Sequence, residues 1–292
     1  MATIIDGKKV SSEVREDIKN EVNILRNKGF RAPGLAVILV GDVAASNIYV
    51  NMKEKACVQA GFYSVVERLD QNITETELLD MVDKYNRDNN IDGILVQLPL
   101  PEHIREAEVV YKISPDKDVD GFHPYNVGLS LIGEDTFCPC TPLGILYLLD
   151  SYGIDLKGMH AVIVGRSNIV GKPMFTLLLR RHATVTVCHS RTVNIENIIK
   201  TADIIIAALG RPGFIKRDWV KKGAVVIDVG INRLPDDSSS SSASKLVGDV
   251  DYDAVFDIAS YITPVPGGVG PMTIAMLMKN TLKSFKQRFK IK

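Results

Sequence analysis

Short apolar runs of strand length alternate along this chain with segments whose apolar residues recur at helical spacing. The clearest runs are GLAVILVG at 34–41, DGILVQLP at 92–99, HAVIVG at 160–165, DIIIAAL at 203–209 and GAVVIDVG at 223–230. Strands covered by helices on both faces show such continuous apolar runs, whereas strands with one solvated face alternate. The pattern therefore predicts an α/β fold of repeated βαβ units with a mainly parallel sheet.

The same periodicities give bounds for the other elements. They predict helices at 8–28, 45–60, 74–89, 103–112 and 170–181, a helix opening within 141–153, and strands at 64–69 and 183–188. The turn-rich stretch SPDKDVDGFHPYN at 114–126 is expected to be an ordered loop or a linker region. The Ser-rich tract at 234–246 is expected to be a flexible surface loop between strands. A last helix should begin at Pro271, since proline suits the first helical turn.

The length favours two domains. A chain of 292 residues exceeds what one hydrophobic core usually serves, and 46% hydrophobic residues can fill two cores. The elements before and after the turn-rich stretch form two similar α/β halves. We therefore expect one domain from each half.

Charge and cysteine usage limit the partners and the compartment. Lysine plus arginine equals aspartate plus glutamate at 35 each, so no net charge attracts nucleic acid or an acidic membrane surface. The start MATIIDGKKV lacks the features of a signal or transit peptide, and no apolar run approaches the roughly 20 residues of a membrane helix. The cysteines, Cys57, Cys138, Cys140 and Cys188, are too few and irregular for a disulfide framework. We expect a protein of the reducing cytoplasm.

A metal site is not implied. Cys138 and Cys140 form a C-x-C pair, but no second pair at finger-like spacing completes a four-ligand zinc site. The five histidines, at 103, 123, 160, 182 and 189, have no mutual metal-ligand spacing. Packing or solvation is the expected role of these cysteines and histidines.

A glycine turn in the second half suggests a nucleotide site. In AVIVGRSNIVGKP, 161–173, a strand ends in Gly165 and a helix begins near Gly171. Glycine lets the backbone approach a phosphate closely, and the helix start offers N–H groups to it. The spacing departs from G-x-G-x-x-G because Arg166 and Ser167 occupy the turn, so an ordinary strand-to-helix turn remains the alternative.

The end of the next strand favours NADP over NAD. In NAD sites an Asp or Glu about 20 residues after the glycines binds the ribose hydroxyls. Here ATVTVC is followed by His189, Ser190, Arg191 and Thr192. A cation with hydroxyl groups in place of a carboxylate suits a 2′-phosphate. The alternative is that Arg191 is a solvated loop cation.

A second candidate site lies in the first half, in SNIYVNMKEKA at 46–56. Tyr49 and Lys53 are four residues apart and therefore share a helix face. The strand before them delivers the helix start to the carboxyl edge of the sheet, where open α/β folds bind ligands. Gln97 ends another strand and Asp120 follows in the DVDG loop. A lone helix lysine is usually a solvated cation, but these four polar residues from separate strand ends suit proton transfer and the binding of a nitrogen-rich ring.

Together the motifs resemble a known family. GDVAASNIYVNMKEKAC, DGILVQLPLP, PDKDVDGFHPYN, PCTPLGI, VIVGRSNIVGKP, VIDVGIN, KLVGDVD and TPVPGGVGPMT are similar to the bifunctional methylenetetrahydrofolate dehydrogenase/cyclohydrolases, in family order and over almost the whole chain. The Ser-rich tract is the one departure. The resemblance implies two α/β domains flanking a cleft: a folate-binding catalytic domain, 1–139, completed by the C-terminal helix 270–292, and a Rossmann-type NADP-binding domain, 140–269. It also implies a homodimer.

The resemblance assigns roles to the residues of the first site. Tyr49 would position the folate ring system, Lys53 would be the acid/base amine, Gln97 would hydrogen-bond to that lysine, and Asp120 would anchor the pterin. The folate pocket would be lined by the backbone of Val96, Gln97 and Leu98 and by Pro266, Gly267, Gly268 and Gly270.

The resemblance also assigns the cofactor residues. Gly165, Arg166 and Ser167 would lie at the phosphates and ribose of NADP. Ser190 and Arg191 would lie near the 2′-phosphate, and Ile231 near the adenosine or nicotinamide.

The implied chemistry requires that Lys53 can exist as the neutral amine. Hydride leaves the one-carbon bridge of methylenetetrahydrofolate for NADP+, which requires chiefly that two rings be aligned. Water then adds to the methenyl cation, and the ring opens to formyltetrahydrofolate with removal and return of a proton. Because a free lysine has a pKa of about 10.4, Lys53 can act as a base only where its surroundings favour the neutral amine.

Three other interpretations are open. A Tyr-x-x-x-Lys pair also occurs in short-chain dehydrogenases, but there the glycine turn precedes the pair, and here it follows. A monofunctional dehydrogenase of the same family is possible on sequence grounds, although Lys53 and Gln97 together argue for both activities. A catalytically silent protein that binds folate or NADP would bind its ligands without turnover.

Overall fold

The structure, a computed structural model, describes residues 1–235 and 244–291. The chain forms two compact units. One, the three-stranded unit, comprises Ser12–Cys140 and Ile274–Lys292; the other, the six-stranded unit, comprises Met1–Ser11 and Thr141–Thr273. These bounds differ from the predicted ones at the start of the chain, because the first eleven residues group with the second half. Among the described residues, no helix is both long and apolar enough to span a bilayer.

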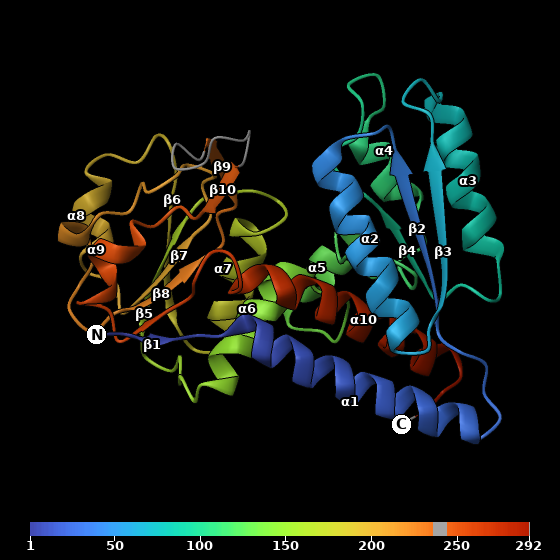
Figure 1. Cartoon of the computed structure of the whole chain (residues 1–292), viewed down its shortest axis with the longest axis horizontal. Coiled ribbons are helices and arrows are strands. Elements are labelled where there is room, and N and C mark those ends of the chain that lie inside the picture. Colours follow the sequence, from blue (N-terminus) through green and yellow to red (C-terminus); the bar gives the residue numbers. More distant parts are fainter. Residues whose placement is uncertain (236–243, 292) are drawn as a thin grey trace. The chain divides into compact units, whose positions relative to one another are not determined.

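The three-stranded unit has a wholly parallel sheet of order β3-β2-β4 (Figure 1). Its elements run β2 Gly34–Val40, α2 Ala44–Gln59, β3 Tyr63–Leu69, α3 Glu75–Arg87, β4 Gly93–Val96 and α4 Glu106–Lys112. Strand β2 is central and buried throughout. Its residues Ala36, Ile38 and Val40 share a core with α3 and α4, and it also contacts α2. Apolar side chains on successive positions of β2 are thus all buried, which explains the continuous run in the sequence.

Helix α5, Pro124–Ile132, was not predicted, because its start lies in the stretch expected to be a loop. The helix has local start and stop signals. The His123 side chain accepts the N–H of Tyr125, Pro124 occupies the first turn, and Gly133 ends the helix with φ of 92°. The turn-forming residues that suggested a loop are therefore the helix cap and the turn before it.

The six-stranded unit has the strand order β1-β11-β8-β7-β5-β6, with every pair parallel. Its strands are β1 Thr3–Ile4, β5 His160–Val164, β6 Thr184–Cys188, β7 Ile204–Ala207, β8 Val225–Asp228 and β11 Tyr261–Ile262. Helices α6 Cys140–Ser151, α7 Gly171–Arg180, α8 Ile195–Ile199, α9 Tyr252–Phe256 and the 3₁₀ turn η1 Arg217–Trp219 complete it. The strands following β5 in the chain go to opposite sides of it, β6 to one and β7 to the other. Rossmann-type sheets bind ligands at such a switch point.

The pairing of β1 with β11 explains the difference in domain bounds. Thr3 and Ile4 lie beside Tyr261 and Ile262, so the chain begins as an edge strand of the six-stranded sheet. A two-residue strand carries no detectable alternation. Strands β1 and β11 were for that reason both missed in the sequence.

A hairpin flanks the Ser-rich tract. Strands β9 Asn232–Pro235 and β10 Ser244–Val247 pair antiparallel, with Asn232 opposite Val247. The prediction of a loop over 234–246 is therefore wrong at both ends, which are strand. Its central part, 236–243, lies outside the described residues.

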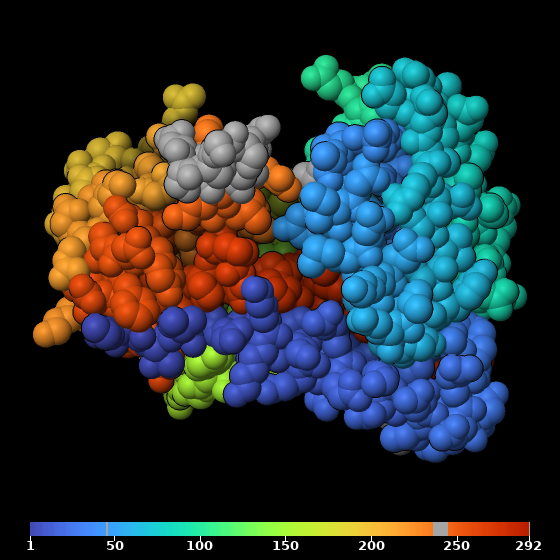
Figure 2. Space-filling model, in the orientation of Figure 1, coloured from blue at the N-terminus to red at the C-terminus, as the bar shows by residue number. Residues whose placement is uncertain are grey.

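Two long helices lie near the ends of the chain, α1 Gly7–Asn27 and α10 Val269–Arg288. Helix α1 buries one apolar stripe, made of Val10, Val14, Ile18, Val22 and Leu25, and exposes the opposite face, seen in dark blue in Figure 2. Helix α10 begins two residues before Pro271, which places the proline in the first turn, where the missing N–H is tolerated.

Candidate active site and nucleotide site

The structure brings Lys53 and Gln97 together. Lys53 lies on α2 and is only 7% exposed. Its Nζ donates a hydrogen bond of 2.9 Å to Oε1 of Gln97, which directly follows β4. Because β2 and β4 are parallel neighbours, with Ile38 opposite Val96, the helix after β2 and the residue after β4 emerge at the same edge of the sheet.

The amide of Gln97 is oriented by the backbone of the next residue. Its Nε2 donates to the carbonyl of Leu98 at 2.7 Å, which leaves Oε1 to face the amine of Lys53. The lysine thus has a neutral hydrogen-bond acceptor as its partner. A neutral acceptor orients the amine without the strong preference for the ammonium form that a carboxylate would impose.

Burial controls the ionisation of the group around Lys53. Burial lowers the pKa of Lys53, and the negative charges available to Asp120, Cys140 and Cys57 oppose that shift. Burial likewise raises the pKa of Asp120, with Lys53 opposing. Both residues are therefore displaced toward their neutral forms. The thiol of Cys140 hydrogen-bonds to Asp120, and burial raises the pKa of Cys140 as well.

Asp118, two residues before Asp120, shapes the loop that carries Asp120. Its buried carboxylate accepts the backbone N–H groups of Gly121, Phe122 and His123 and the side-chain amide of Asn126. Gly121 has φ of 75°, and a Cβ there would lie 2.5 Å from the carbonyl carbon of Cys138. In DVDG the first aspartate and the glycine therefore fix the turn, while the second aspartate interacts electrostatically with Lys53.

The remaining predicted folate residues fall into two groups. Tyr49 lies one turn before Lys53 on α2 and is half-buried. Val96, Leu98 and Asp120 line a small pocket of the three-stranded unit together with Asp118 and Phe122. These residues belong to the unit that holds Lys53.

The second group, Pro266, Gly267, Gly268 and Gly270, belongs to the six-stranded unit. At two of these positions the backbone requires glycine. Gly267 has φ of 110°, and a Cβ on Gly268 would lie 2.6 Å from the carbonyl oxygen of Pro264. Around Gly270 there is more space, since the nearest atom to a Cβ would be Cδ1 of Ile231 at 3.9 Å. Gly270 and Ile231, predicted for the folate and for the cofactor, are thus neighbours.

A pocket of about 350 Å³ lies at the carboxyl edge of the six-stranded sheet, between the segments that follow β5, β6 and β7. It is lined by the predicted residues Gly165, Arg166, Ser167 and Ser190, and by His189, Thr192, Ile195, Ala208, Leu209, Arg211 and Phe214. A Cβ on Gly165 would lie 2.2 Å from the carbonyl oxygen of Ala208, so only glycine fits between the ends of β5 and β7. A phosphate-bearing ligand fits this lining, which combines a glycine turn with two cations, Arg166 and Arg211.

Two hydrogen-bonded turns shape the pocket. The Ser167 hydroxyl accepts the N–H groups of Val170 and Gly171 at the start of α7. In the turn after β6, His189 accepts the N–H of Thr192 and donates its own N–H to the hydroxyl of that residue. Arg191 is exposed on this fixed turn, next to the pocket-lining Ser190.

Arg211 was missed by the sequence analysis. It lines the pocket from the segment after β7, and its guanidinium lies over the ring of Phe214 at 4.8 Å. The residues ALGRP carry no motif of their own. The only signal in the sequence was position, since the segment follows a buried strand and therefore lies at the carboxyl edge. Ile231, in contrast, is exposed and does not line this pocket.

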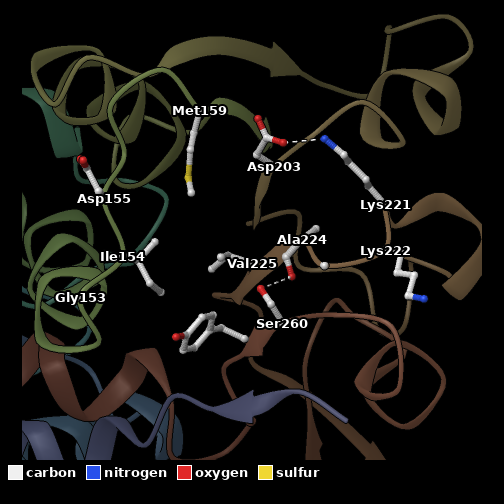
Figure 3. Close-up of a pocket in the computed structure, with 12 residues that line it drawn as sticks. Gly153, Ile154, Asp155, Met159, Asp203, Lys221, Lys222, Ala224, Val225 and Ser260 are labelled. Atoms are coloured by element: carbon white, nitrogen blue, oxygen red, sulfur yellow. Dashed lines mark hydrogen bonds and ion pairs between the residues drawn. The ribbon is translucent and has the colours of Figure 1, made fainter.

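A second pocket, of about 510 Å³, lies at the opposite, amino edge of the same sheet (Figure 3). The ion pair of Lys221 and Asp203, 2.7 Å, and the hydrogen bond from Ser260 to the carbonyl of Ala224 lie in its wall. Two turn glycines, Gly153 and Gly223, line it, but neither joins the end of a strand to the start of a helix. Since open α/β sheets bind at the carboxyl edge, the smaller pocket is the nucleotide candidate. Within the described ranges no cluster of three or more His, Cys, Asp or Glu residues could hold a metal ion.

Two family models match the chain. The tetrahydrofolate dehydrogenase/cyclohydrolase catalytic domain matches residues 5–120, and the NAD(P)-binding domain of the same family matches residues 139–289. The chain belongs to the tetrahydrofolate dehydrogenase/cyclohydrolase family. The family predicted from the sequence is thereby confirmed, and with it the α/β fold with a Rossmann-type NAD(P)-binding domain.

Individual relatives agree with the family models. The chain is 54% identical to the bifunctional protein FolD of Acetivibrio thermocellus, over 100% of this chain and 99% of the relative. The crystal structure of the bifunctional enzyme FolD from Campylobacter jejuni matches with a TM-score of 0.94 at 51% identity, covering 99% of this chain and 100% of the other. The Trypanosoma brucei enzyme, complexed with NADP and an inhibitor, has a TM-score of 0.94 at 40% identity, covering 99% of each chain.

Proposed function

We propose that this chain oxidises 5,10-methylenetetrahydrofolate to 5,10-methenyltetrahydrofolate with NADP+, and hydrolyses the product to 10-formyltetrahydrofolate. The observation that carries the proposal is the buried amine of Lys53 hydrogen-bonded to the neutral amide of Gln97. Family membership supplies the reaction class, and this pair supplies the acid/base group that the hydrolytic step needs.

The dehydrogenase step needs alignment more than acid/base chemistry. NADP+, when bound, accepts the hydride from the one-carbon bridge of the folate. Gly165 and Ser167 would hold its phosphates and ribose, with Arg166 supplying positive charge. The six-stranded unit is thus the proposed cofactor domain.

The cyclohydrolase step uses Lys53. Water adds its oxygen to the methenyl carbon, one carbon–nitrogen bond breaks, and the leaving ring nitrogen takes a proton. Neutral Lys53 would remove one proton of the attacking water and return it to that nitrogen. The second water proton is released to solvent as the added oxygen becomes the formyl carbonyl, which balances the loss of the substrate's positive charge. Burial lowers the pKa of Lys53, which favours the neutral amine needed for the first of these transfers. Gln97 would keep the amine oriented through the change in protonation.

The other folate residues would bind rather than transfer protons. Tyr49 would stack against the ring system, and Asp120 would accept hydrogen bonds from the pterin amino and ring N–H groups. The backbone of Val96–Leu98 and of Pro266–Gly270 would complete the lining. The three-stranded unit, with residues 270–292, is accordingly the proposed folate-binding domain.

Three further expectations belong to this proposal. Arg191 beside Ser190 favours NADP over NAD, since a guanidinium suits the 2′-phosphate. The four cysteines are free and buried, which fits a reducing cytoplasm. A homodimer is expected from the family resemblance.

The deciding experiment follows reduced cofactor spectroscopically with methylenetetrahydrofolate and either NADP+ or NAD+, then follows the loss of methenyl substrate added alone. We expect reduction with NADP+ and rapid hydrolysis of the methenyl compound. Reduction of NADP+ without hydrolysis of the methenyl compound would show that the chain is a monofunctional dehydrogenase. Folded protein that binds both ligands and turns over neither would overturn the proposal in favour of a silent binding protein.

A further inference from the structure

Two motifs, VIDVGIN and KLVGDVD, each bury a carboxylate to which the proposed reaction gives no role. Asp228 is 3% exposed and Asp249 is fully buried. Within the described part of the chain, neither forms an ion pair with a lysine or arginine. A buried charge without a cation is costly unless hydrogen bonds replace its hydration. The hydrogen bonds of these two residues therefore indicate what they are for.

Asp249 binds the backbone of one segment. Its carboxylate accepts the N–H groups of Leu209, Gly210 and Arg211, at 2.6, 2.9 and 2.8 Å, and the side-chain amide of Asn232, at 2.9 Å. Three successive N–H groups converging on one carboxylate fix the path of the segment. That segment leads directly out of β7 into the candidate nucleotide pocket, where Leu209 and Arg211 line the wall.

Asp228 in turn holds Asp249. Its carboxylate accepts the N–H groups of Gly230, Asp249 and Val250, each at 2.9 Å. The contact is so close that a Cβ on Gly248 would lie 1.9 Å from Oδ2 of Asp228. A Cβ on Gly230 would lie 2.3 Å from Oδ1 of Asp249. The glycine in each motif thus makes room for the carboxylate of the other.

The held segment meets the glycine turn. A Cβ on Gly165 would lie 2.2 Å from the carbonyl oxygen of Ala208, immediately before the segment that Asp249 binds. A shift of Leu209–Arg211 would therefore change both the position of the Arg211 guanidinium and the wall that the Gly165 turn packs against. Arg211 is the pocket cation whose position depends most directly on Asp249.

We propose that Arg211 binds an anionic group of the dinucleotide and that Asp249, supported by Asp228, is the positioning residue that presents it. The inference rests on the proposed function of this pocket. It adds a cation to those predicted from the sequence and gives a role to two buried aspartates. Asp249 touches no ligand itself; it acts by fixing three N–H groups of the segment that carries Arg211.

The test compares Asp249→Asn and Arg211→Ala with Asp203→Asn in the full-length enzyme. Asparagine has the size of aspartate, but its NH₂ group would face an N–H donor. Each test variant should raise the KM for NADP+ by about tenfold or more, the effect of losing a hydrogen bond to a charged group, with kcat at saturation changed far less. Asp203 is a matched control, because its carboxylate also accepts a backbone N–H but lies at the amino edge.

Two readouts separate positioning from general damage. Hydrolysis of methenyl substrate without cofactor should be unchanged in each variant, because it depends on Lys53 in the other unit. Binding of NADPH can be followed by energy transfer from Trp219, the single tryptophan, whose ring lies 5.3 Å from that of pocket-lining Phe214. Both test variants should weaken this binding, and the double variant should be no weaker than the worse single variant, because Asp249 acts through Arg211.

An unchanged KM for NADP+ in folded Arg211→Ala would overturn the assignment of that cation. An unchanged KM in Asp249→Asn, or fully additive losses in the double variant, would overturn the positioning role. If Asp249→Asn does not fold, Asn232→Ala removes one of the four donors to the carboxylate and should raise the KM in the same direction. A wild-type enzyme without NADP+ turnover would instead refute the proposed function.

Discussion

The amine of Lys53 and the amide oxygen of Gln97 lie 2.9 Å apart, the first on α2 and the second immediately after β4. The pair places a buried amine against a partner that carries no charge. A carboxylate in the position of Gln97 would hold the lysine as an ammonium and prevent it from accepting a proton. A solvent-exposed lysine would keep its ordinary high pKa and stay protonated near neutral pH, so it could not accept a proton either. The arrangement found satisfies the amine and still lets it titrate.

Replacing Lys53 by methionine should abolish the cyclohydrolase far more than the dehydrogenase. Methionine fills the same space but can move no proton, so hydrolysis should fall by about 10²- to 10⁴-fold, the usual contribution of an acid/base group. Hydride transfer, which depends on ring alignment, should fall much less. Rates of methenyl hydrolysis and of NADPH formation measure the two effects. Lys55→Met, an exposed lysine on the same helix, is the control; full hydrolysis by Lys53→Met would refute the assignment.

Replacing Gln97 by glutamate should move the pH dependence of hydrolysis. In the native enzyme burial lowers the pKa of Lys53, so the rate should rise with pH and level off as the amine loses its proton. A carboxylate at this position stabilises the ammonium, and the rise should shift to higher pH. The pH–rate profile of methenyl hydrolysis measures the shift. Gln59→Glu, an exposed site on α2, should leave the profile unchanged. A glutamate variant with the native profile would show that Lys53 is not the titrating base.

Replacing Arg191 by glutamine should weaken the binding of NADP+ but not that of NAD+. Loss of a charge-assisted hydrogen bond to the 2′-phosphate corresponds to an increase in KM of about tenfold to a hundredfold. The KM for NAD+, which lacks that phosphate, should barely change. Steady-state kinetics with both cofactors give the ratio. Lys222→Gln removes an exposed cation at the amino edge of the sheet and serves as the control. An equal rise in KM for NADP+ and NAD+ would show that Arg191 does not bind the 2′-phosphate.

What the sequence predicted well was set by local patterns. The run GLAVILVG identified β2 because all its residues are buried, and its parallel pairing with β4 explains why Lys53 and Gln97 could be expected at one edge. The glycine turn at Gly165 was recognisable because the close contact with Ala208 excludes a side chain. Each of these features lies within two successive βαβ units of one sheet.

What the sequence did not predict depends on distant segments. Asp249 accepts N–H groups about forty positions earlier in the chain, at Leu209–Arg211, and no spacing rule relates the two. Arg211 has no motif of its own and gains its place only from that contact. Strand β1 is two residues long and exists because β11 offers an edge. In helix α5 the cap residues were recognised as turn formers, and the weak helical pattern behind them was not used.

Replacing Asp228 by asparagine should flatten the pH dependence of stability between about pH 4 and pH 7. Burial and, to a smaller extent, the nearby Asp249 raise the pKa of Asp228 to about 7, against the opposing effect of its three backbone N–H donors. In this range the unfolded chain releases the proton of Asp228 while the folded protein retains it, so the free energy of unfolding falls as pH rises. The contribution of Asp228 to stability is greatest below the pKa of the unfolded chain and is lost by the time the pH exceeds 7.

Urea denaturation of Asp228→Asn at several pH values should therefore show a shallower decline in the free energy of unfolding than wild type. The variant is less stable throughout, because its NH₂ group faces a donor. Asp253→Asn, which alters an exposed carboxylate of the same unit, should retain the wild-type slope. Parallel curves for Asp228→Asn and wild type would mean that Asp228 is ionised throughout this range, held charged by its three N–H donors.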